Sequence, residues 1–123
     1  MIVGVPREIK KDEHRAALSP GAVEALASAG HAVLIEKGAG LGAGIADREY
    51  REAGGRVVPA AEEVWGRAEM VVKVKEPLRA EHALMREGQT LFAFLHLAAA
   101  QPLARVLLRQ RVRAIAFETV RTA

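Results

Sequence analysis

Two side chains that could take part in chemistry, Lys75 and His96, stand at the ends of two short apolar segments. Residues 70–75 (MVVKVK) end in Lys75, and residues 90–95 (TLFAFL) are followed by His96. Both segments are short and rich in β-branched or aromatic residues, which favours buried strands. Helical patterns flank both, and strands that alternate with helices predict a parallel sheet covered on both faces.

The expected positions of Lys75 and His96 favour a ligand site. In such sheets small ligands bind just beyond the carboxyl ends of the strands, so both side chains would face one crevice. A primary amine and a titratable imidazole there suit carboxylate or carbonyl chemistry. Each residue also has a structural explanation, because a lysine at a strand end is usually solvated and such a histidine is usually hydrogen-bonded. The residues alone leave both explanations open.

The composition limits the class of protein. A length of 123 residues predicts one domain, and a hydrophobic share of 50% allows a real core. Aromatic residues make up only 4%, so that core should be mostly aliphatic. The net charge of +3 is spread along the chain, and no basic cluster is interleaved with aromatics. We therefore expect no nucleic-acid partner.

Absent residue types exclude further classes. The sequence has no cysteine, which excludes disulfides, thiol catalysis and cysteine-ligated metals. The acidic and imidazole side chains of residues 12–14 are consecutive and point apart, so no metal site is predicted. No apolar run approaches the roughly 18 residues of a membrane span. We expect a soluble, cytoplasmic protein, and the lack of asparagine is typical of a thermophile.

The pattern along the chain predicts a doubly wound α/β unit. Strands are expected at residues 2–5, 31–36, 56–58, 70–75, 90–95 and 112–117. Helices are expected from Pro20 to Gly30 with Ser19 as N-cap, from Asp47 as cap to residue 53, and at residues 60–65, 78–86 and 102–110. The expected fold is Rossmann-like (flavodoxin-like), with a mostly parallel sheet of about six strands and helices on both faces.

A glycine-rich segment could be mistaken for a nucleotide site. Residues 38–43 (GAGLGA) satisfy the G-x-G-x-x-A pattern after a predicted strand, and Glu62 and Glu63 follow about 20 residues later. However, the anchoring mechanism needs a helix that begins at the loop, and only the short helical segment 47–53 follows, several residues late. We therefore favour a structural loop.

Several sequence blocks resemble the amino-terminal part of the alanine dehydrogenases, a family that shares this signature with the α subunit of proton-translocating nicotinamide nucleotide transhydrogenases. The blocks are PRE (6–8), EHRAALSP (13–20), EKGAG (36–40), VKVKEP (72–77) and FLHLA (94–98). They extend over essentially the whole chain. Transhydrogenase α subunits typically lack a lysine at the position of Lys75 and carry an aromatic residue at that of His96, so the chain is more similar to alanine dehydrogenases.

This resemblance implies a reaction and roles for three residues. The reaction is the NAD-dependent, reversible oxidative deamination of L-alanine to pyruvate and ammonium. The position of Arg15 is the one that holds the substrate carboxylate, which a guanidinium fork suits. Lys75 corresponds to a second substrate anchor and catalytic residue that binds and polarises the substrate. His96 corresponds to the general acid and base, a role for which an imidazole titrates in the right range.

The resemblance also implies a domain organisation. Residues 1–123 would be the amino-terminal segment of the catalytic, substrate-binding domain. The NAD-binding domain, with its own glycine fingerprint, and the carboxyl-terminal completion of the catalytic domain are absent from this chain. NAD would therefore be bound mainly elsewhere, no cofactor-binding residue is expected here, and the chain alone should be inactive. Family members usually form homohexamers.

Two alternatives stay open on the sequence. The chain could be a domain of a transhydrogenase α subunit, which Lys75 and His96 disfavour. It could also be a non-enzymatic α/β module that binds a small carboxylate through Arg15 and Lys75.

Overall fold

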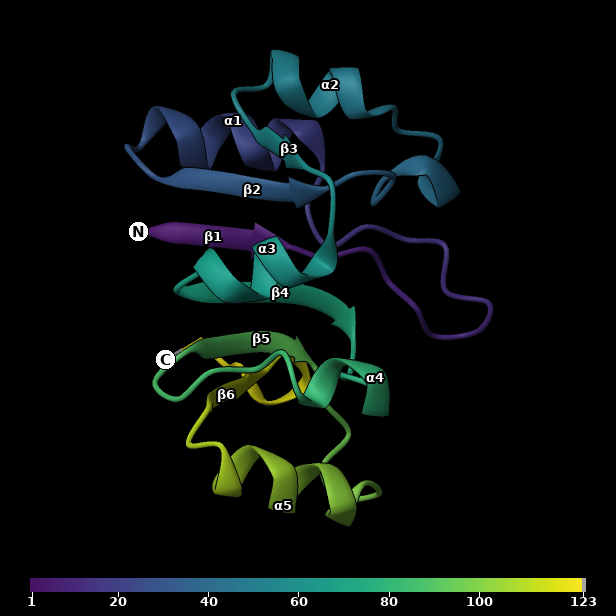
Figure 1. Cartoon of the computed structure of the whole chain (residues 1–123), viewed down its shortest axis with the longest axis vertical. Coiled ribbons are helices and arrows are strands. Elements are labelled where there is room, and N and C mark those ends of the chain that lie inside the picture. Colours follow the sequence, from purple (N-terminus) through teal and green to yellow (C-terminus); the bar gives the residue numbers. More distant parts are fainter. Residues whose placement is uncertain (123) are drawn as a thin grey trace.

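One six-stranded sheet with helices packed on both faces forms the computed structural model, which describes residues 1–122 (Figure 1). The strands are β1 (Ile2–Val5), β2 (Ala32–Glu36), β3 (Arg56–Val58), β4 (Met70–Lys75), β5 (Thr90–Phe94) and β6 (Arg113–Ala116). Neighbouring strands pair in parallel in the order β3-β2-β1-β4-β5-β6. This is the Rossmann order and not that of flavodoxin, and the predicted doubly wound α/β fold is confirmed.

The helices follow the strands along the chain. They are α1 (Pro20–Ser28), α2 (Asp47–Glu52), α3 (Ala61–Arg67), α4 (Arg79–His82) and α5 (Gln101–Arg109), with short 3-10 helices η1 (Leu41–Ala43) and η2 (Phe117–Thr119). The predicted cap of α1 is confirmed, because Ser19 Oγ accepts the Ala22 N–H at 3.1 Å. Within the described residues, no helix has the length and apolar character that crossing a membrane would require.

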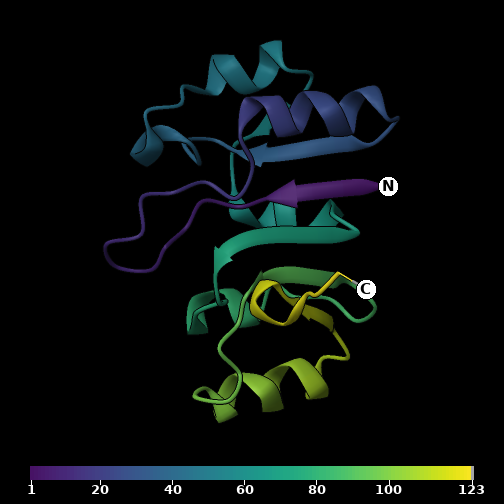
Figure 2. The ribbon, with the colours of Figure 1, turned by 180° about the vertical axis from the view of Figure 1, so that it is seen from behind.

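Two apolar layers hold the helices on the sheet. On one face, Val23 of α1 and Tyr50 of α2 pack with Val5, Val33 and Ile35. On the other face, α3 packs over β1 and β2 and, together with α5, over β4 and β5. The buried side chains of that layer include Trp65, Val71, Leu91, Leu103 and Leu107. Figure 2 shows α1 and η2 on the same side of the sheet, opposite α3. Each fully buried aliphatic side chain contributes roughly 1.5–3 kcal/mol.

The predicted role of Asp47 as a helix cap is wrong. Ala46 is the N-cap of α2, and its N–H donates to the Glu49 carboxylate at 2.7 Å. Asp47 is the first helical residue, and its Oδ1 instead accepts the N–H of Gly38 at 2.9 Å. Asp47 therefore fastens the glycine-rich loop to α2, a contact that local sequence signals do not encode.

The helix predicted over residues 78–86 is shorter than expected, because α4 covers only Arg79–His82. The Arg86 guanidinium donates to the carbonyl of Trp65 at 3.0 Å and to that of Ala68 at 2.8 Å. These carbonyls lie at the carboxyl end of α3, where a helix leaves its last acceptors unpaired. Contacts with another helix therefore determine the conformation of this segment, and not its own helical pattern.

Candidate functional site

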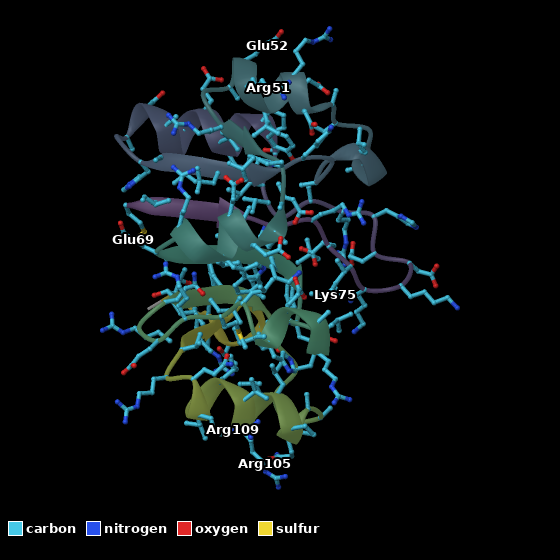
Figure 3. The ribbon with its side chains drawn as sticks, in the orientation of Figure 1. Arg51, Glu52, Glu69, Lys75, Arg105 and Arg109 are labelled. Carbon is cyan, nitrogen blue, oxygen red and sulfur yellow. The ribbon has the colours of Figure 1, made fainter. Side chains whose placement is uncertain are left out.

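The carboxyl ends of β1 and β4 form the point at which the strand order reverses. β2 and β3 extend to one side of β1, and β5 and β6 extend to the far side of β4. In open α/β sheets the crevice at this switch point is the usual ligand site. Lys75 ends β4 at this edge, whereas Glu69, just before β4, lies at the opposite edge (Figure 3).

Lys75 comes from an irregular end of β4. The pairing of β4 with β5 is regular up to Val72, shifts register, and resumes with Lys75 opposite Phe94. The Lys75 N–H donates to Glu8 Oε1 at 3.0 Å, and the residue is half-buried. A bulge of this kind changes the direction of the side chains that follow it and is common beside active sites. Glu8 thus holds the backbone of Lys75, and the Lys75 amine stays at the carboxyl ends of the strands.

Arg15 lies on the long loop between β1 and α1, and Glu13 holds it in place. Arg15 donates to the Glu13 carboxylate through Nη2 at 2.7 Å, Nε at 2.9 Å and its backbone N–H at 2.8 Å. The Arg15 side chain is 65% exposed, whereas that of Glu13 is 5% exposed. The side-chain hydrogen bond from Arg15 lowers the pKa of Glu13 from 4.5 to about 2. Because Nη1 is not used by Glu13, donors of the fork stay available for a ligand.

Arg15 and Lys75 line one pocket at this edge. Its volume is about 430 Å³, and its lining is the loop segment Lys10, Lys11, Asp12, Glu13, His14 and Arg15 together with Lys75. An ion pair between Lys10 and Glu76 joins the loop to the residue that follows β4. Cations outnumber carboxylates in this lining, which suits an anionic ligand.

His96 reaches the same edge of the sheet but is not in the lining of this pocket. It follows β5 and has a φ of 50°, a region that residues other than glycine rarely adopt. Glu118, on η2, accepts the His96 N–H at 2.7 Å and the Leu95 N–H at 3.1 Å. The His96 N–H is the main cause that lowers the pKa of Glu118. The imidazole is 56% exposed, and its Nδ1 lies 3.8 Å from Glu118 Oε2.

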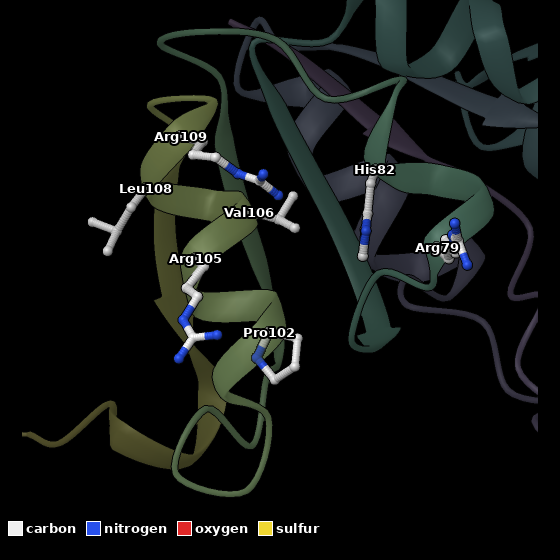
Figure 4. Close-up of a pocket in the computed structure, with 7 residues that line it drawn as sticks. All are labelled: Arg79, His82, Pro102, Arg105, Val106, Leu108 and Arg109. Carbon is white, nitrogen blue, oxygen red and sulfur yellow. The ribbon is translucent and has the colours of Figure 1, made fainter.

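A larger groove of about 880 Å³ lies away from these residues, between α4 and α5 (Figure 4). Its lining is Arg79, His82, Pro102, Arg105, Val106, Leu108 and Arg109. None of the three residues predicted to bind or transform a substrate contributes to it. Within residues 1–122, no three histidine, aspartate or glutamate side chains are grouped as metal ligands would be.

A family comparison adds to this geometry. A sequence model of the family described as "Alanine dehydrogenase/PNT, N-terminal domain" matches residues 4–123. The chain belongs to this family. It is 52% identical over all 123 residues to an alanine dehydrogenase of Methanococcus maripaludis and covers 33% of that protein. It is also 52% identical over 120 residues, 98% of the chain, to the alanine dehydrogenase of Bacillus subtilis, of which it covers 32%.

Solved structures agree with this assignment. A structure titled L-alanine dehydrogenase has a TM-score of 0.96 and 56% identity, over 99% of this chain and 34% of its own. A transhydrogenase from Sinorhizobium meliloti has a TM-score of 0.92 and 29% identity, over 100% of this chain and 36% of its own. The chain therefore spans about a third of the length of these relatives, and the alanine dehydrogenases, which are oxidoreductases, share more of its sequence.

The glycine-rich loop of this family member packs against protein. A Cβ added at Gly40 would lie 2.8 Å from the Tyr50 ring and from Ile45, and one at Gly42 would lie 2.8 Å from the His14 carbonyl oxygen. The loop follows β2, whereas a Rossmann phosphate-binding turn follows β1. Close packing explains these glycines, and the loop is not where a dinucleotide is expected.

Sequence reasoning missed the carboxylates that hold the predicted residues. Glu8 accepts from the Lys75 backbone, Glu13 accepts from Arg15, and Glu118 accepts from the His96 backbone. In the sequence, Glu13 stands out as a metal-ligand type and as part of a family motif, and neither signal indicates that it holds Arg15. The buried state of Glu8 has no local signal, because its partners lie more than 60 residues away along the chain. Lys73, which is 1% exposed, could have been noticed as a charge inside an apolar run.

Proposed function

We propose that the full-length polypeptide containing this chain catalyses the NAD-dependent, reversible oxidative deamination of L-alanine to pyruvate and ammonium. The observation that carries the proposal is the convergence of Arg15 and Lys75 on one cationic pocket at the switch point of the sheet. The share of identical residues with alanine dehydrogenases supports it. Residues 1–123 would be the amino-terminal segment of the catalytic domain.

Arg15 and Lys75 divide the binding of the substrate between them. The free donors of the Arg15 guanidinium bind the planar carboxylate of alanine or pyruvate. Glu13 keeps the guanidinium in one orientation, so less entropy is lost when the substrate binds. The Lys75 ammonium hydrogen-bonds the substrate at the carbonyl oxygen of pyruvate, where it draws electron density from the carbon that changes oxidation state.

His96 exchanges protons with the substrate side of the reaction. During deamination, once the α-carbon has lost its hydride, water adds to the resulting iminium carbon, and ammonia leaves from the carbinolamine. A base must take a proton from water and return one to the leaving nitrogen, and an imidazole can do both near neutral pH. Glu118 holds the backbone of His96 just after β5 and leaves the imidazole exposed.

The residues of this chain do not fit a dinucleotide site. The connection after β1 has no glycine turn, and Gly40 and Gly42 in the loop after β2 are filled by protein atoms. We therefore assign NAD, which would accept the hydride, to a domain outside residues 1–123. We also propose a cytoplasmic homohexamer as the full-length form, with L-alanine, pyruvate and ammonium as its small-molecule partners and neither nucleic acid nor membrane among them.

The transhydrogenase alternative is the weaker one. The similarity in fold to the Sinorhizobium meliloti protein is close, but the identity is 29%, against 46–56% for the alanine dehydrogenases compared. The chain also has Lys75 and His96, at positions where transhydrogenase α subunits typically differ. The other alternative, a non-enzymatic module that binds a small carboxylate, would have the same pocket, but the full-length protein would show no turnover.

Kinetics on the polypeptide encoded by the complete reading frame test the proposal. NADH oxidation is measured with pyruvate and ammonium in the wild type, Lys75→Ala and His96→Ala. We expect turnover in the wild type and a loss of several orders of magnitude in each variant, because both groups act on the reacting atoms. Lys37→Ala and His31→Ala, away from the pocket, are the matched controls and should retain wild-type rates.

Two other outcomes would redirect the assignment. A wild type that binds NADH but does not turn over would favour a transhydrogenase-like or binding role. NADH binding by a polypeptide of residues 1–123, measured by calorimetry, would contradict the assignment of NAD to another domain.

A further inference from the structure

Lys73 is a buried cation that the proposed reaction does not use. Its side chain is 1% exposed, and its Nζ lies 3.2 Å from Glu8 Oε1 and 3.3 Å from Glu81 Oε2. The Glu8 and Glu81 side chains are 2% and 5% exposed. A buried lysine is costly unless it is paired, so this triad of Glu8, Lys73 and Glu81 needs an explanation.

Glu8 takes the place of a neighbouring strand at the end of β4. β1 pairs with β4 only through Val3 with Met70 and Gly4 with Val71, and then the chain leaves the sheet. Beyond that point the two oxygens of Glu8 accept the N–H groups of Val74 at 3.1 Å and Lys75 at 3.0 Å. A carboxylate therefore satisfies backbone donors that β1 no longer reaches.

These contacts coincide with the irregularity of β4. The register shift lies between Val72 and Lys75, so Lys73 and Val74 occupy the bulge itself. The Lys73 amine contacts the same Glu8 oxygen that accepts the Lys75 N–H. If Lys73 lost its charge, the buried Glu8 carboxylate would be left without a cation to balance it. Its hydrogen bond to the Lys75 backbone would then weaken.

Glu81 connects the triad to α4. Its Oε1 accepts the Leu78 N–H at 3.0 Å at the start of the helix, and its Oε2 faces Lys73. Two carboxylates share one ammonium here, and burial raises the pKa of Glu81. Lys73 thus joins three segments, which are the loop after β1, the end of β4 and the start of α4.

We propose that Lys73 is a positioning residue that, through Glu8 and Glu81, holds the bulged end of β4 in the conformation from which Lys75 contacts substrate. This positioning role rests on the proposed function, because it requires that Lys75 binds the substrate. A displacement of a reacting group by about 1 Å can lower a rate about 100-fold, so indirect control of Lys75 has a measurable size.

A double-mutant cycle on the full-length protein tests this role. The four proteins are the wild type, Lys73→Met, Lys75→Ala and the double variant, and the measurements are kcat/KM for pyruvate and pyruvate affinity by calorimetry in the presence of NAD⁺. We expect Lys73→Met to lower kcat/KM by up to about 100-fold. We expect no further loss when Lys75 is already alanine, because the effect passes through Lys75.

Further variants keep the test decisive if Lys73→Met does not fold. Lys73→Met/Glu81→Gln keeps the net charge of the triad at −1 and should show the same coupling to Lys75→Ala. Leu107→Ala, which removes buried side-chain volume on α5, controls for lost stability and should lower Tm while leaving kcat/KM unchanged.

Each outcome distinguishes the two proposals. Losses that multiply in the double variant, or a Lys73 variant with wild-type kinetics, overturn the positioning role and leave the proposed function intact. A wild type without turnover overturns the proposed function, and the positioning role falls with it.

Discussion

At the scale of single residues, the Glu13–Arg15 pair makes stability depend on pH. The folded pKa of Glu13, about 2, is below its ordinary value of 4.5, so the folded state binds fewer protons between these values. The stabilisation by the pair is therefore complete above about pH 4.5 and lost as the pH falls towards 2. We expect the Tm of the wild type to fall more steeply than that of Glu13→Gln in this range, by a few °C at most because Arg15 is exposed.

Thermal unfolding followed by circular dichroism between pH 6 and 2.5 measures this difference. Glu52→Gln is the matched control, because Glu52 is 70% exposed and lies 3.6 Å from Arg48 on α2. The Tm of Glu52→Gln should change with pH in parallel with the Tm of the wild type. If the Tm of Glu13→Gln also changes with pH in parallel with the wild type, the ion pair with Arg15 does not lower the pKa of Glu13.

Glu118 should affect catalysis through the backbone of His96. The φ of 50° at His96 costs of order 1–3 kcal/mol and persists because the Glu118 carboxylate accepts the N–H groups of His96 and Leu95. We expect Glu118→Ala to lower kcat by up to about 100-fold, and Glu118→Gln, which keeps one acceptor oxygen, to recover part of the loss. Glu87→Ala removes an exposed partner of Arg111 and is the control. Equal rates in Glu118→Ala and the wild type would contradict the argument.

The sequence contains part of this site in a form that can be recognised. Lys75 and His96 could be placed because each ends an apolar segment, and Arg15 because a family motif marks it. Glu8 and Glu118 could not, because their partners are 66 and 22 residues away and become neighbours only in the folded sheet. The residues proposed to act on the substrate are therefore easier to pick out in the sequence than the residues that hold them.

At the scale of elements, α3 packs on β1 through a glycine. A Cβ at Gly4 would lie 2.7 Å from both Ala68 and Val64, so nothing larger than hydrogen fits there. We expect Gly4→Ala to destabilise the fold by about 1–3 kcal/mol through overpacking. Gly66 of α3 has no heavy atom within 4 Å of an added Cβ, and Gly66→Ala should stabilise by about 0.5–1 kcal/mol.

Urea unfolding of both variants beside the wild type checks these opposite signs. Gly4 lies in the contact between β1 and α3, whereas Gly66 lies on the open side of α3, so a shared effect on expression or assembly would shift both variants in one direction. A stabilised Gly4→Ala would mean that α3 moves away from β1 at little cost.

The limits of prediction also differ between elements. Strands were expected close to where they occur, because a parallel sheet buried on both faces requires continuous apolar runs such as Val33, Leu34 and Ile35. The sequence predicts too long a helix over residues 78–86, because the Arg86 side chain binds carbonyls at the end of α3 and does not continue α4. Local patterns therefore predicted the buried strands well and failed where side chains bridge elements.

At the scale of the whole molecule, the sheet is covered unequally. On the side of α1, η2 packs over β5, with the Phe117 ring 3.9 Å from that of Phe92 and 5.1 Å from that of Phe94, centroid to centroid. Phe94, Ile115 and Val120 are nevertheless 38%, 40% and 56% exposed. Exposed apolar side chains gathered at one end of a sheet are a feature of interfaces or of association.

A polypeptide of residues 1–123 should consequently associate with itself. We expect its weight-average mass in sedimentation equilibrium to rise with concentration, and Ile115→Lys to lower that rise by placing a charge on the exposed face of β6. Leu108→Lys is the matched control, because Leu108 is 78% exposed but lies on α5, away from this face. Since burial of apolar area drives association, the control should leave the mass unchanged. A monomer at all concentrations, or equal effects of both lysines, would show that this face is not the surface through which copies meet.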